Sequence, residues 1–375
     1  MARSKKATKK ATKKASPKVR TPTPKKQASQ LQVLTQAREH FGKKYPDQIR
    51  LMSELDNTVP GYVSTQSLAL DWIIGNNGAP MSRIVDASGD EGVGKSTVGD
   101  HLMAQMQAIG GHAWLWDTEN ARDDRYQEKV GIVRKRAGQI LSHTLEDGFE
   151  VMIDLLTWHL ANDPDRPGII LWDTPAGTPT RAEADPEKKD ERFGPAKLIR
   201  GNIRKLNQIL QQTKWILCVI NQTYMGQNMS GQTYKAVYGG GGIPFYSSVR
   251  LSLGYVSQFW RTSTDKEMKL PPIGQTVWVK CIKSRVSIPH RSKQICILFG
   301  EGIDNTWEIF NTLVGAGCIK QAGGWYGFDP DYNLELATKY PDKWQGGFMA
   351  LKEMIKVRPE MWGDLMRVYE SLEIK

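Results

Sequence analysis

The sequence predicts an α/β fold: a mostly parallel central sheet with helices on both faces and an antiparallel extension at one edge. Apolar, strand-like runs alternate with helical segments through the middle of the chain, which favours a parallel sheet. A glycine-rich phosphate loop lies between an early strand and the helix that follows it. From residue 249 onward, apolar and polar residues alternate, as in antiparallel strands with one covered face.

The chain begins with a strongly basic arm. The formal net charge is +11, and eleven basic residues before Ala28 account for all of it, with no acidic residue before Glu39. The eleven are Arg3, Lys5, Lys6, Lys9, Lys10, Lys13, Lys14, Lys18, Arg20, Lys25 and Lys26. Because this arm has almost no apolar side chains, we expect residues 1–28 to be disordered and to bind a polyanion such as nucleic acid. A solubilising tail and a mitochondrial transit peptide are the alternatives.

The composition argues against several classes of protein. With 375 residues and 39% hydrophobic content, the chain can build a main domain with additions. No apolar stretch follows the basic arm and none approaches transmembrane length, so we expect neither a secretory signal nor a membrane partner. The cysteines form no C-x-x-C pair, which predicts buried thiols in a reducing compartment. They are Cys218, Cys281, Cys296 and Cys318.

The first predicted element is a short amphipathic helix over residues 30–42, ended by Gly42. Its apolar positions are Leu31, Val33, Leu34, Ala37 and Phe41. An isolated helix of this length is marginal in water. We therefore expect it to pack either on the core of its own chain or on a neighbouring subunit.

Residues 89–97 fit the phosphate-loop pattern G-x-x-x-x-G-K-[ST] at every required position. They are Gly89, Asp90, Glu91, Gly92, Val93, Gly94, Lys95, Ser96 and Thr97. The glycines let backbone N–H groups face phosphate oxygens, Lys95 would reach the β- and γ-phosphates of ATP, and the Ser96 hydroxyl would bind Mg²⁺. A strand over residues 83–87 and a helix over residues 98–109 supply the required context. The alternative is a chance glycine-rich turn.

Three further buried strands are predicted at residues 112–116, 168–173 and 214–220, with helices over 149–160 and 196–212 between them. Glu119, Asp173 and Gln222 stand at or just after the ends of these strands. Because ligands bind at the carboxyl edge of parallel strands, we expect the three side chains to meet near the phosphate loop. Asp173 ends its strand as a Walker B acid does, which predicts a place in the Mg²⁺ shell with Ser96.

The pattern changes in the last third of the chain. Residues 249–255 and 277–281 alternate between apolar and polar, which predicts the antiparallel extension of the sheet. Beyond residue 300 the chain becomes rich in tryptophan and glycine, with helices predicted around residues 349–355 and 362–372.

Several stretches of the sequence together resemble bacterial and phage recombinases of the RecA type. They are Ser67-Leu68-Ala69-Leu70-Asp71, residues 89–97, residues 117–123, Ile220-Asn221-Gln222, residues 245–251, residues 299–303 and residues 322–326. The match runs from about residue 30 to the C-terminus, with large divergence between the stretches, as in a distant member. It implies a DNA-dependent ATPase that uses ATP and Mg²⁺, forms filaments and exchanges homologous strands. It also implies the cytoplasm of a bacterial cell or a phage-infected host, in association with the nucleoid.

The resemblance implies a division of the chain into four parts. These are the disordered arm (1–28), an N-terminal polymerisation helix with its linker (29–60), a RecA-type phosphate-loop ATPase core (61–299) and a small α/β C-terminal domain (300–375). The implied partners are single-stranded DNA, double-stranded DNA and further copies of the chain in a helical filament, with ATP at the subunit interfaces.

The same resemblance implies roles for individual residues. Glu119 matches the catalytic glutamate, which can act on the water that attacks the γ-phosphate; an ordinary acid at a strand end is the alternative. Asp123 and Tyr126 match positions that contact adenine, and Gln222 matches the glutamine that senses the γ-phosphate. Lys283 and Arg285 match two basic positions that reach the neighbouring subunit's ATP. The family has lysine at both positions, and an arginine binds phosphate differently from a lysine. Phe245 matches a residue at the subunit interface.

Two DNA-binding loops are implied at residues 175–193 and 223–242. The first contains Arg181, Lys188, Lys189 and Arg192 among acidic residues that nearly cancel their charge. The second contains Gln227, Asn228, Ser230, Gln232 and Lys235, followed by Gly239, Gly240, Gly241 and Gly242. Polar, aromatic and glycine residues suit contacts with the backbone and bases of a single strand. A disordered surface loop without DNA is compatible with this role.

Two other functions remain open on sequence grounds. A hexameric motor with the same core, such as a helicase or a packaging ATPase, would share the phosphate loop, although the N-terminal helix and the C-terminal stretch argue against it. A DNA-coating protein without catalysis would keep the fold, although the intact Lys95, Ser96, Glu119 and Asp173 argue against that.

Overall fold

The computed structural model describes residues 24–45, 48–54, 58–185, 194–227, 231–261 and 263–373. The chain divides into two compact units, Met1–Thr58 and Val59–Lys375, which are described separately below. Most of the basic arm, residues 1–23, lies outside the described residues. So do residues 186–193 and 228–230 of the two predicted DNA loops.

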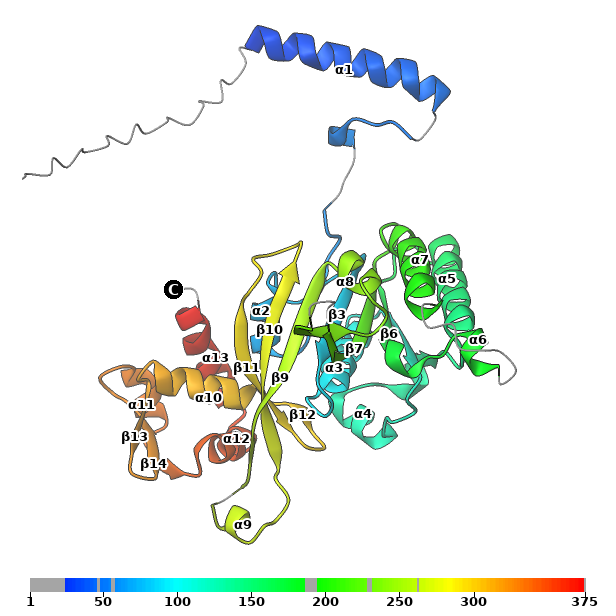
Figure 1. The fold of residues 1–375 in the computed structure, drawn as a ribbon. Coiled ribbons are helices and arrows are strands. Elements are labelled where there is room, and N and C mark those ends of the chain that lie inside the picture. The colour runs from blue at the N-terminus through cyan, green and yellow to red at the C-terminus, as the bar shows by residue number, and fades with distance from the viewer. Residues whose placement is uncertain are drawn as a thin grey trace, which may run out of the picture. The chain divides into compact units, whose positions relative to one another are not determined.

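The first unit contains the long helix α1 (Pro24–Lys44) and the 3₁₀ turn η1 (Met52–Glu54) (Figure 1). The helix predicted over residues 30–42 is confirmed, but it begins earlier, so the expectation of disorder is wrong for residues 24–28. Pro24 suits the first position because the N–H that proline lacks would have no partner within the helix there. The exposed apolar side chains described on α1 are Leu31, Val33, Leu34 and Phe41.

A large mixed sheet organises the second unit (Figure 1). Its main strands are β3 (Arg83–Gly89), β4 (His112–Asp117), β5 (Ala137–Gln139), β6 (Gly168–Asp173), β7 (Trp215–Gln227), β9 (Val249–Phe259), β10 (Gly274–Ser284), β11 (Ser292–Leu298) and β12 (Gly302–Ile303). They lie in the order β12-β11-β10-β9-β3-β7-β6-β4-β5. Neighbours from β9 to β5 run parallel, and β10, β11 and β12 add antiparallel pairs. The predicted parallel sheet with an antiparallel extension is confirmed.

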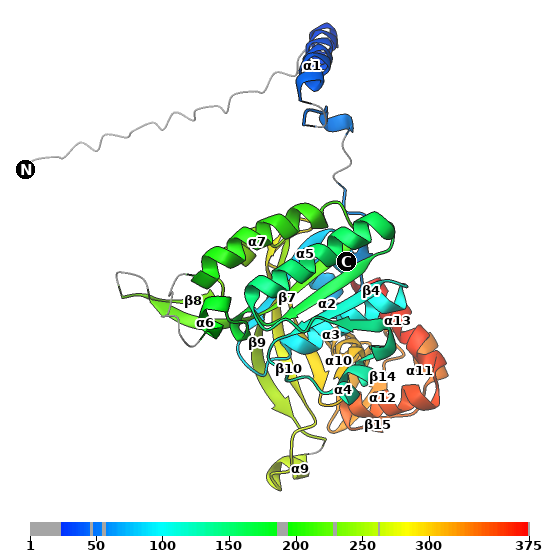
Figure 2. The ribbon, with the colours of Figure 1, turned by 90° about the vertical axis from the view of Figure 1, so that its right-hand side faces the viewer.

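Helices cover both faces of this sheet (Figure 2). α2 (Leu68–Ile74) and α3 (Lys95–Ala108) share one hydrophobic core with the sheet, and α5 (Leu145–Asn162) and α7 (Gly194–Leu210) share the other. Successive residues of a strand enter opposite cores, as Ile84 and Val85 of β3 do. Because both faces are covered, the parallel strands are nearly continuous apolar runs in the sequence.

Shorter elements connect these layers. They are β1 (Tyr62–Val63), β2 (Ala79–Pro80), α4 (Asp124–Val130), η2 (Arg134–Arg136), η3 (Pro175–Gly177), α6 (Arg181–Ala184), β8 (Thr233–Val237), α8 (Gly242–Tyr246) and α9 (Ser263–Glu267). The expected end of the third strand near Gln222 is wrong, because β7 continues to Gln227 and pairs antiparallel with β8. Threonine and tyrosine, which favour strands, are frequent in both segments. Part of the predicted second DNA loop is therefore a β-hairpin.

The C-terminal region has a hydrophobic core of its own. Its elements are α10 (Asn305–Gly315), β13 (Ile319–Ala322), β14 (Trp325–Phe328), α11 (Leu334–Lys339), β15 (Trp344–Gln345), α12 (Gly347–Val357) and α13 (Glu360–Glu373). The three strands form a separate antiparallel sheet, and the two helices predicted near the C-terminus are confirmed as α12 and α13. Leu68 of α2 packs against this core, which connects the region to the main sheet.

Two expectations about the whole chain can be compared with the structure. All four cysteines are buried and free, as predicted. Across the ranges described above, no helix is both long and apolar enough to cross a membrane.

Candidate functional site

The phosphate loop connects β3 to α3 at the carboxyl edge of the parallel strands. Gly92 and Gly94 have positive φ angles of 72° and 84°, which L side chains rarely adopt. A Cβ on Gly94 would also lie 2.2 Å from the Ile297 side chain, so a larger residue would strain the backbone and displace that side chain. The loop leads into the N-terminus of α3, where free N–H groups and the helix dipole favour an anion. This geometry suits the phosphates of a nucleotide.

Lys95 is nearly buried at the start of α3, and its Nζ donates a hydrogen bond of 2.7 Å to the backbone carbonyl of Asp90. Burial lowers the pKa of the Lys95 ammonium, and the carboxylates of Asp173 and Glu119 oppose that shift. A cation held among carboxylates and facing the phosphate loop is well placed to bind the β- and γ-phosphates.

The Ser96 hydroxyl donates a hydrogen bond of 2.7 Å to Asp173 Oδ2. Asp173 ends β6, paired in register with Asp117 of β4 and Ile220 of β7, so parallel pairing brings the acid to the loop. A hydroxyl and a carboxylate are the hard oxygen ligands that Mg²⁺ prefers. Within the described ranges, no group of three or more His, Cys, Asp or Glu residues could hold a metal ion. The two oxygens of Ser96 and Asp173 fit a cation that takes its other ligands from phosphate and water, as Mg²⁺ does.

Glu119 and Gln222 are brought together from different strands. Gln222 Nε2 donates a hydrogen bond of 2.8 Å to Glu119 Oε1, and Gln222 is the register partner of Gly89, the first loop residue. Burial first, and the nearby Asp173 carboxylate second, raise the pKa of the Glu119 carboxyl. A raised pKa makes a carboxylate a stronger base at neutral pH.

The two predicted adenine-contacting residues lie beside the end of the phosphate loop. The Asp123 carboxylate accepts a hydrogen bond of 2.8 Å from the Tyr126 N–H and so caps α4. The Tyr126 hydroxyl lies 2.8 Å from Thr97 Oγ1. The tyrosine ring is thereby fixed next to the loop, where a planar base could stack on it.

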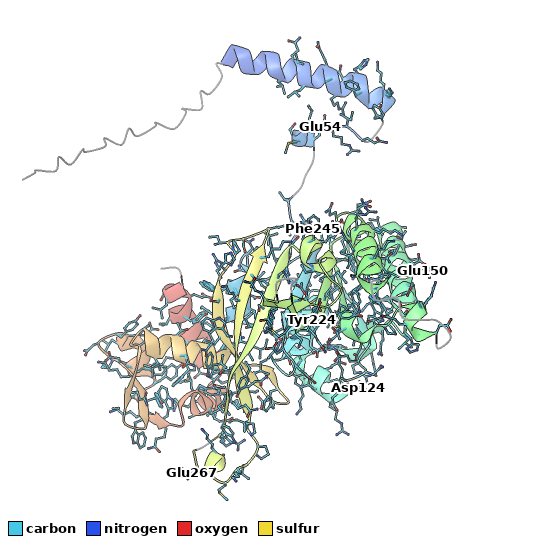
Figure 3. All side chains as sticks on the ribbon, viewed as in Figure 1. Glu54, Asp124, Glu150, Tyr224, Phe245 and Glu267 are labelled. Carbon is cyan, nitrogen blue, oxygen red and sulfur yellow. The ribbon has the colours of Figure 1, made fainter. Side chains whose placement is uncertain are left out.

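Lys283 and Arg285 lie together, but in the described part of the chain their hydrogen bonds go to α8. Lys283 Nζ donates to the carbonyls of Pro244 (2.7 Å) and Phe245 (2.9 Å), and Arg285 Nη2 donates to the Phe245 carbonyl (3.0 Å). Burial, then the charges of Arg285 and Arg250, lower the pKa of Lys283 to about 8. The Phe245 side chain is 63% exposed (Figure 3). These residues thus form one patch of two cations and an exposed ring.

The first predicted DNA loop is described only in part. Arg181 begins α6, and its guanidinium pairs with Asp147 (Nε to Oδ1, 2.9 Å) and with Glu150 of α5 (3.2 Å). Glu150 is labelled in Figure 3. Such exposed ion pairs are weak, so DNA phosphate could displace them. Lys188, Lys189 and Arg192 lie outside the described residues.

The second predicted DNA loop touches the phosphate loop. Lys235 of β8 forms an ion pair of 2.8 Å with Asp90, and the Thr223 hydroxyl donates 2.7 Å to the same carboxylate. Both bonds, that of Lys235 first, lower the pKa of the Asp90 carboxyl. Tyr224, labelled in Figure 3, is exposed on the same hairpin. Gln227 ends β7, Gln232 precedes β8, and Asn228 and Ser230 lie outside the described residues.

The glycine run that follows the hairpin leads into α8. Gly239 and Gly240 have positive φ angles, and a Cβ on Gly242 would lie 2.9 Å from the backbone of Arg200. A hollow of about 480 Å³ lies here, lined by Ala196, Lys197, Arg200, Gly241, Gly242 and Phe245. The sequence interpretation missed Lys197 and Arg200, although their place on the polar face of α7 could have indicated them. It also missed Arg122, whose guanidinium contacts Asp173.

The sequence of the chain matches known proteins. A family model described as the RecA N-terminal domain matches residues 30–304. The chain is 30% identical over 327 residues to Protein RecA of Lactobacillus acidophilus, with 86% of each chain covered. It is 31% identical to Protein RecA of Lactiplantibacillus pentosus, over 86% of this chain and 82% of that protein. It is 30% identical over 319 residues to Protein RecA of Lactobacillus delbrueckii subsp. bulgaricus, over 84% of this chain and 92% of that protein.

Proposed function

The chain belongs to the RecA family, and from this premise we propose that it is a recombinase that couples ATP hydrolysis to strand exchange. It assembles on single-stranded DNA with ATP and Mg²⁺, and pairs that strand with a homologous duplex. In this proposal, strand exchange takes place in the cytoplasm, on DNA. Further copies of the chain complete each nucleotide site.

One observation carries this proposal: the hydrogen bond between Gln222 and Glu119. Glu119 stands where a base for hydrolysis is needed. Gln222 lies in β7, and the residues of β7 that follow it pair with β8 to form the β7–β8 hairpin. A strand that runs from the nucleotide to a DNA-binding hairpin gives each ligand a direct effect on the other. An ATPase whose activity does not depend on DNA would not need a hydrogen bond between its base and such a strand.

In this proposal the chain's own residues divide the work. The backbone of the phosphate loop and Lys95 bind the phosphates, and Ser96 and Asp173 hold Mg²⁺, which neutralises charge on the phosphates. Glu119 orients the attacking water and accepts its proton. Gln222 senses the γ-phosphate and transmits its presence to the hairpin. Asp123 and Tyr126 hold the base.

DNA binding and assembly belong to other surfaces of the chain. The β7–β8 hairpin, the glycines at 239–242 and the cations of α7 face single-stranded DNA, together with the loop at 175–193. Lys283 and Arg285 reach the ATP of the neighbouring subunit, and α1 packs on that neighbour. Leu31, Val33, Leu34 and Phe41 are exposed on α1 and supply an apolar surface for such a contact. The C-terminal domain binds the duplex.

An ATPase assay with and without single-stranded DNA, followed by electron microscopy, tests the proposal. We expect hydrolysis to depend on DNA and to disappear in Lys95→Ala, and we expect open helical filaments with ATP and DNA. Closed rings would instead indicate a hexameric motor. DNA coating with no hydrolysis would indicate a binding protein that merely retains the fold.

A further inference from the structure

Arg122 connects three parts of the nucleotide site. It lies in the loop after β4, close to Glu119, and its side chain is only 8% exposed. One terminal nitrogen, Nη1, donates to Asp100 of α3, and the other, Nη2, donates to Asp173 Oδ2 of β6 at 2.6 Å. A single guanidinium therefore holds the loop of the proposed base to the phosphate-loop helix and to the proposed Mg²⁺ strand.

The contact with Asp173 involves the same oxygen that binds Ser96. Asp173 Oδ2 accepts both the Ser96 hydroxyl at 2.7 Å and Arg122 Nη2. A carboxylate held by two donors at one oxygen cannot rotate freely about its Cβ–Cγ bond. The direction of the Ser96 hydroxyl, which depends on that oxygen, is then fixed as well.

Asp100 serves as the second anchor for Arg122. Its side chain is 2% exposed on α3, and besides Arg122 it accepts a long hydrogen bond of 3.5 Å from Gln127 Nε2. Arginine suits this place because its guanidinium stays charged and presents donors in a rigid planar fork. One cation between two carboxylates leaves a net charge of about −1, which still favours a divalent cation beside Asp173.

We propose that Arg122 is a positioning residue for ATP hydrolysis, which fixes Asp173 for Ser96 and holds the Glu119 loop, with Asp100 as its anchor. This inference rests on the proposed function, because it concerns the same site. It assigns a role in orientation, not in contact with the reacting atoms. The hydrogen bonds of Arg122 go to Asp100 and Asp173 and not to residues 89–95, so we expect nucleotide affinity at saturating Mg²⁺ to stay near that of the parent protein.

The alternative is that Arg122 and Asp100 form a buried ion pair that only supports the fold. Removing one partner would leave a buried charge unpaired and would destabilise any protein, so single deletions do not separate the two roles. Replacing both partners with apolar residues of similar volume is often tolerated. We therefore expect the double variant Asp100→Leu/Arg122→Leu to fold, with Asp173 still bonded to Ser96, and to lose both contacts of Arg122.

The test compares this double variant with the parent protein and with Arg134→Gln. Arg134 is the matched control, because its exposed ion pair with Asp124 (2.7 Å) lies nearby but does not reach Asp173. The first measurement is the Mg²⁺ concentration needed for binding a fluorescent, non-hydrolysable ATP analogue. The second is kcat and KM for ATP with saturating single-stranded DNA.

We expect the double variant to need roughly ten times more Mg²⁺ for nucleotide binding and to lose about tenfold or more in kcat, the usual size for a residue that orients a metal ligand. We expect KM at saturating Mg²⁺ to stay near the parent value. Unchanged Mg²⁺ dependence and unchanged kcat would overturn the proposal and leave the pair a structural one.

The test still decides in two further cases: an unfolded double variant and a parent protein without ATP hydrolysis. If a melting curve shows that the double variant is unfolded, Arg122→Lys replaces it: a lysine keeps the charge but cannot bridge two carboxylates, so we expect the same Mg²⁺ shift in smaller size, and no shift would overturn the proposal. If the parent protein hydrolyses no ATP, the proposed function fails. The Mg²⁺ dependence of nucleotide binding still decides the role of Arg122.

Discussion

Glu119 is the residue whose substitution should separate nucleotide binding from hydrolysis. Glu119→Gln keeps the size of the side chain and its contact with Gln222 but removes the base. We expect ATP binding to persist and hydrolysis to fall by roughly 10²- to 10⁴-fold, the usual contribution of a general base. The variant should remain on DNA, because its bound ATP is not hydrolysed and the ATP-bound state persists.

Single-turnover hydrolysis and the rate of dissociation from DNA measure this effect. Glu128→Gln, on the exposed side of α4, is the matched control and should behave like the parent protein. If Glu119→Gln hydrolyses ATP at the parent rate, another group is the base.

The residues that meet at the sheet edge were largely predictable. Glu119 follows β4, Asp173 ends β6, and Gln222 is the last β7 residue paired with β3. Parallel strands end at one edge, so the approach of these residues to the phosphate loop follows from the strand pattern. Arg122 and Asp100 were not found, because contacts between a loop and a buried helix face leave no spacing rule in a sequence. The one available signal was a charged residue, Asp100, between the apolar positions Val98 and Leu102 of α3.

At the scale of elements, the long periodic segments were predicted and the short ones were missed. β4, β6, α5 and α7 carry enough apolar positions to show their period, whereas α2 and α4 have seven residues each, about two helical turns. The β7–β8 hairpin was missed for a different reason. One face of its two strands mixes polar residues such as Lys235 with apolar ones such as Met225, so no clear alternation of apolar and polar residues marks it as a strand.

The contact between α3 and β12 makes the fold sensitive to acid. His101 of α3 accepts a hydrogen bond of 2.9 Å from the Ile303 N–H at Nε2 and lies 3.3 Å from the Gln66 side chain. Burial lowers the pKa of His101 from 6.5 to about 4. Between pH 6.5 and about pH 4, the unfolded chain therefore binds a proton at His101 and the folded chain does not. This contribution to the free energy of unfolding is complete above pH 6.5 and declines as the pH falls toward 4.

Between pH 7 and pH 5 this one group should reduce the free energy of unfolding by about 2 kcal/mol. Chemical denaturation of the parent protein and of His101→Gln at both pH values measures it, since glutamine keeps an acceptor for Ile303 but does not titrate. We expect a smaller loss in His101→Gln, whereas the exposed His143→Gln should match the parent. Equal losses in all three proteins would show that His101 does not govern acid stability.

At the scale of the whole molecule, the proposed filament makes a prediction about mixed subunits. A Lys283→Ala/Arg285→Ala variant should bind ATP but fail to hydrolyse it alone, because it cannot complete its neighbour's site. Lys95→Ala should fail because its own phosphate loop cannot bind ATP correctly, although its Lys283 and Arg285 can still reach a neighbour's ATP. Mixing the two should restore part of the activity, since some interfaces then carry one intact set. If mixed filaments form and no ratio restores hydrolysis, the two cations do not act on a neighbour.

The basic arm should dominate the salt dependence of DNA binding. Residues 2–23 carry nine basic residues, and deleting them leaves α1 intact. Each phosphate neutralised on a single strand contributes roughly −0.7 to the slope of log affinity against log salt. If about half of the nine engage, the deletion should make the slope shallower by about three units per subunit.

Affinity for single-stranded DNA across a salt series measures that slope. A full-length variant with the same nine residues changed to glutamine is the matched control, because it keeps the length of the arm, and it should behave like the deletion. ATP hydrolysis without DNA should be unaffected in both. Parallel lines with equal slopes would mean that the arm does not bind DNA.

Strand exchange tests the proposed recombinase function most directly. The measurement is the transfer of a labelled strand from a linear duplex to a homologous single-stranded circle, with ATP and Mg²⁺, for the parent protein and for Lys95→Ala. We expect joint molecules and then exchanged product with the parent protein, neither with Lys95→Ala, and neither with a heterologous duplex. DNA-dependent ATP hydrolysis without any joint molecules on homologous DNA would contradict the assignment and indicate a motor built on the same core.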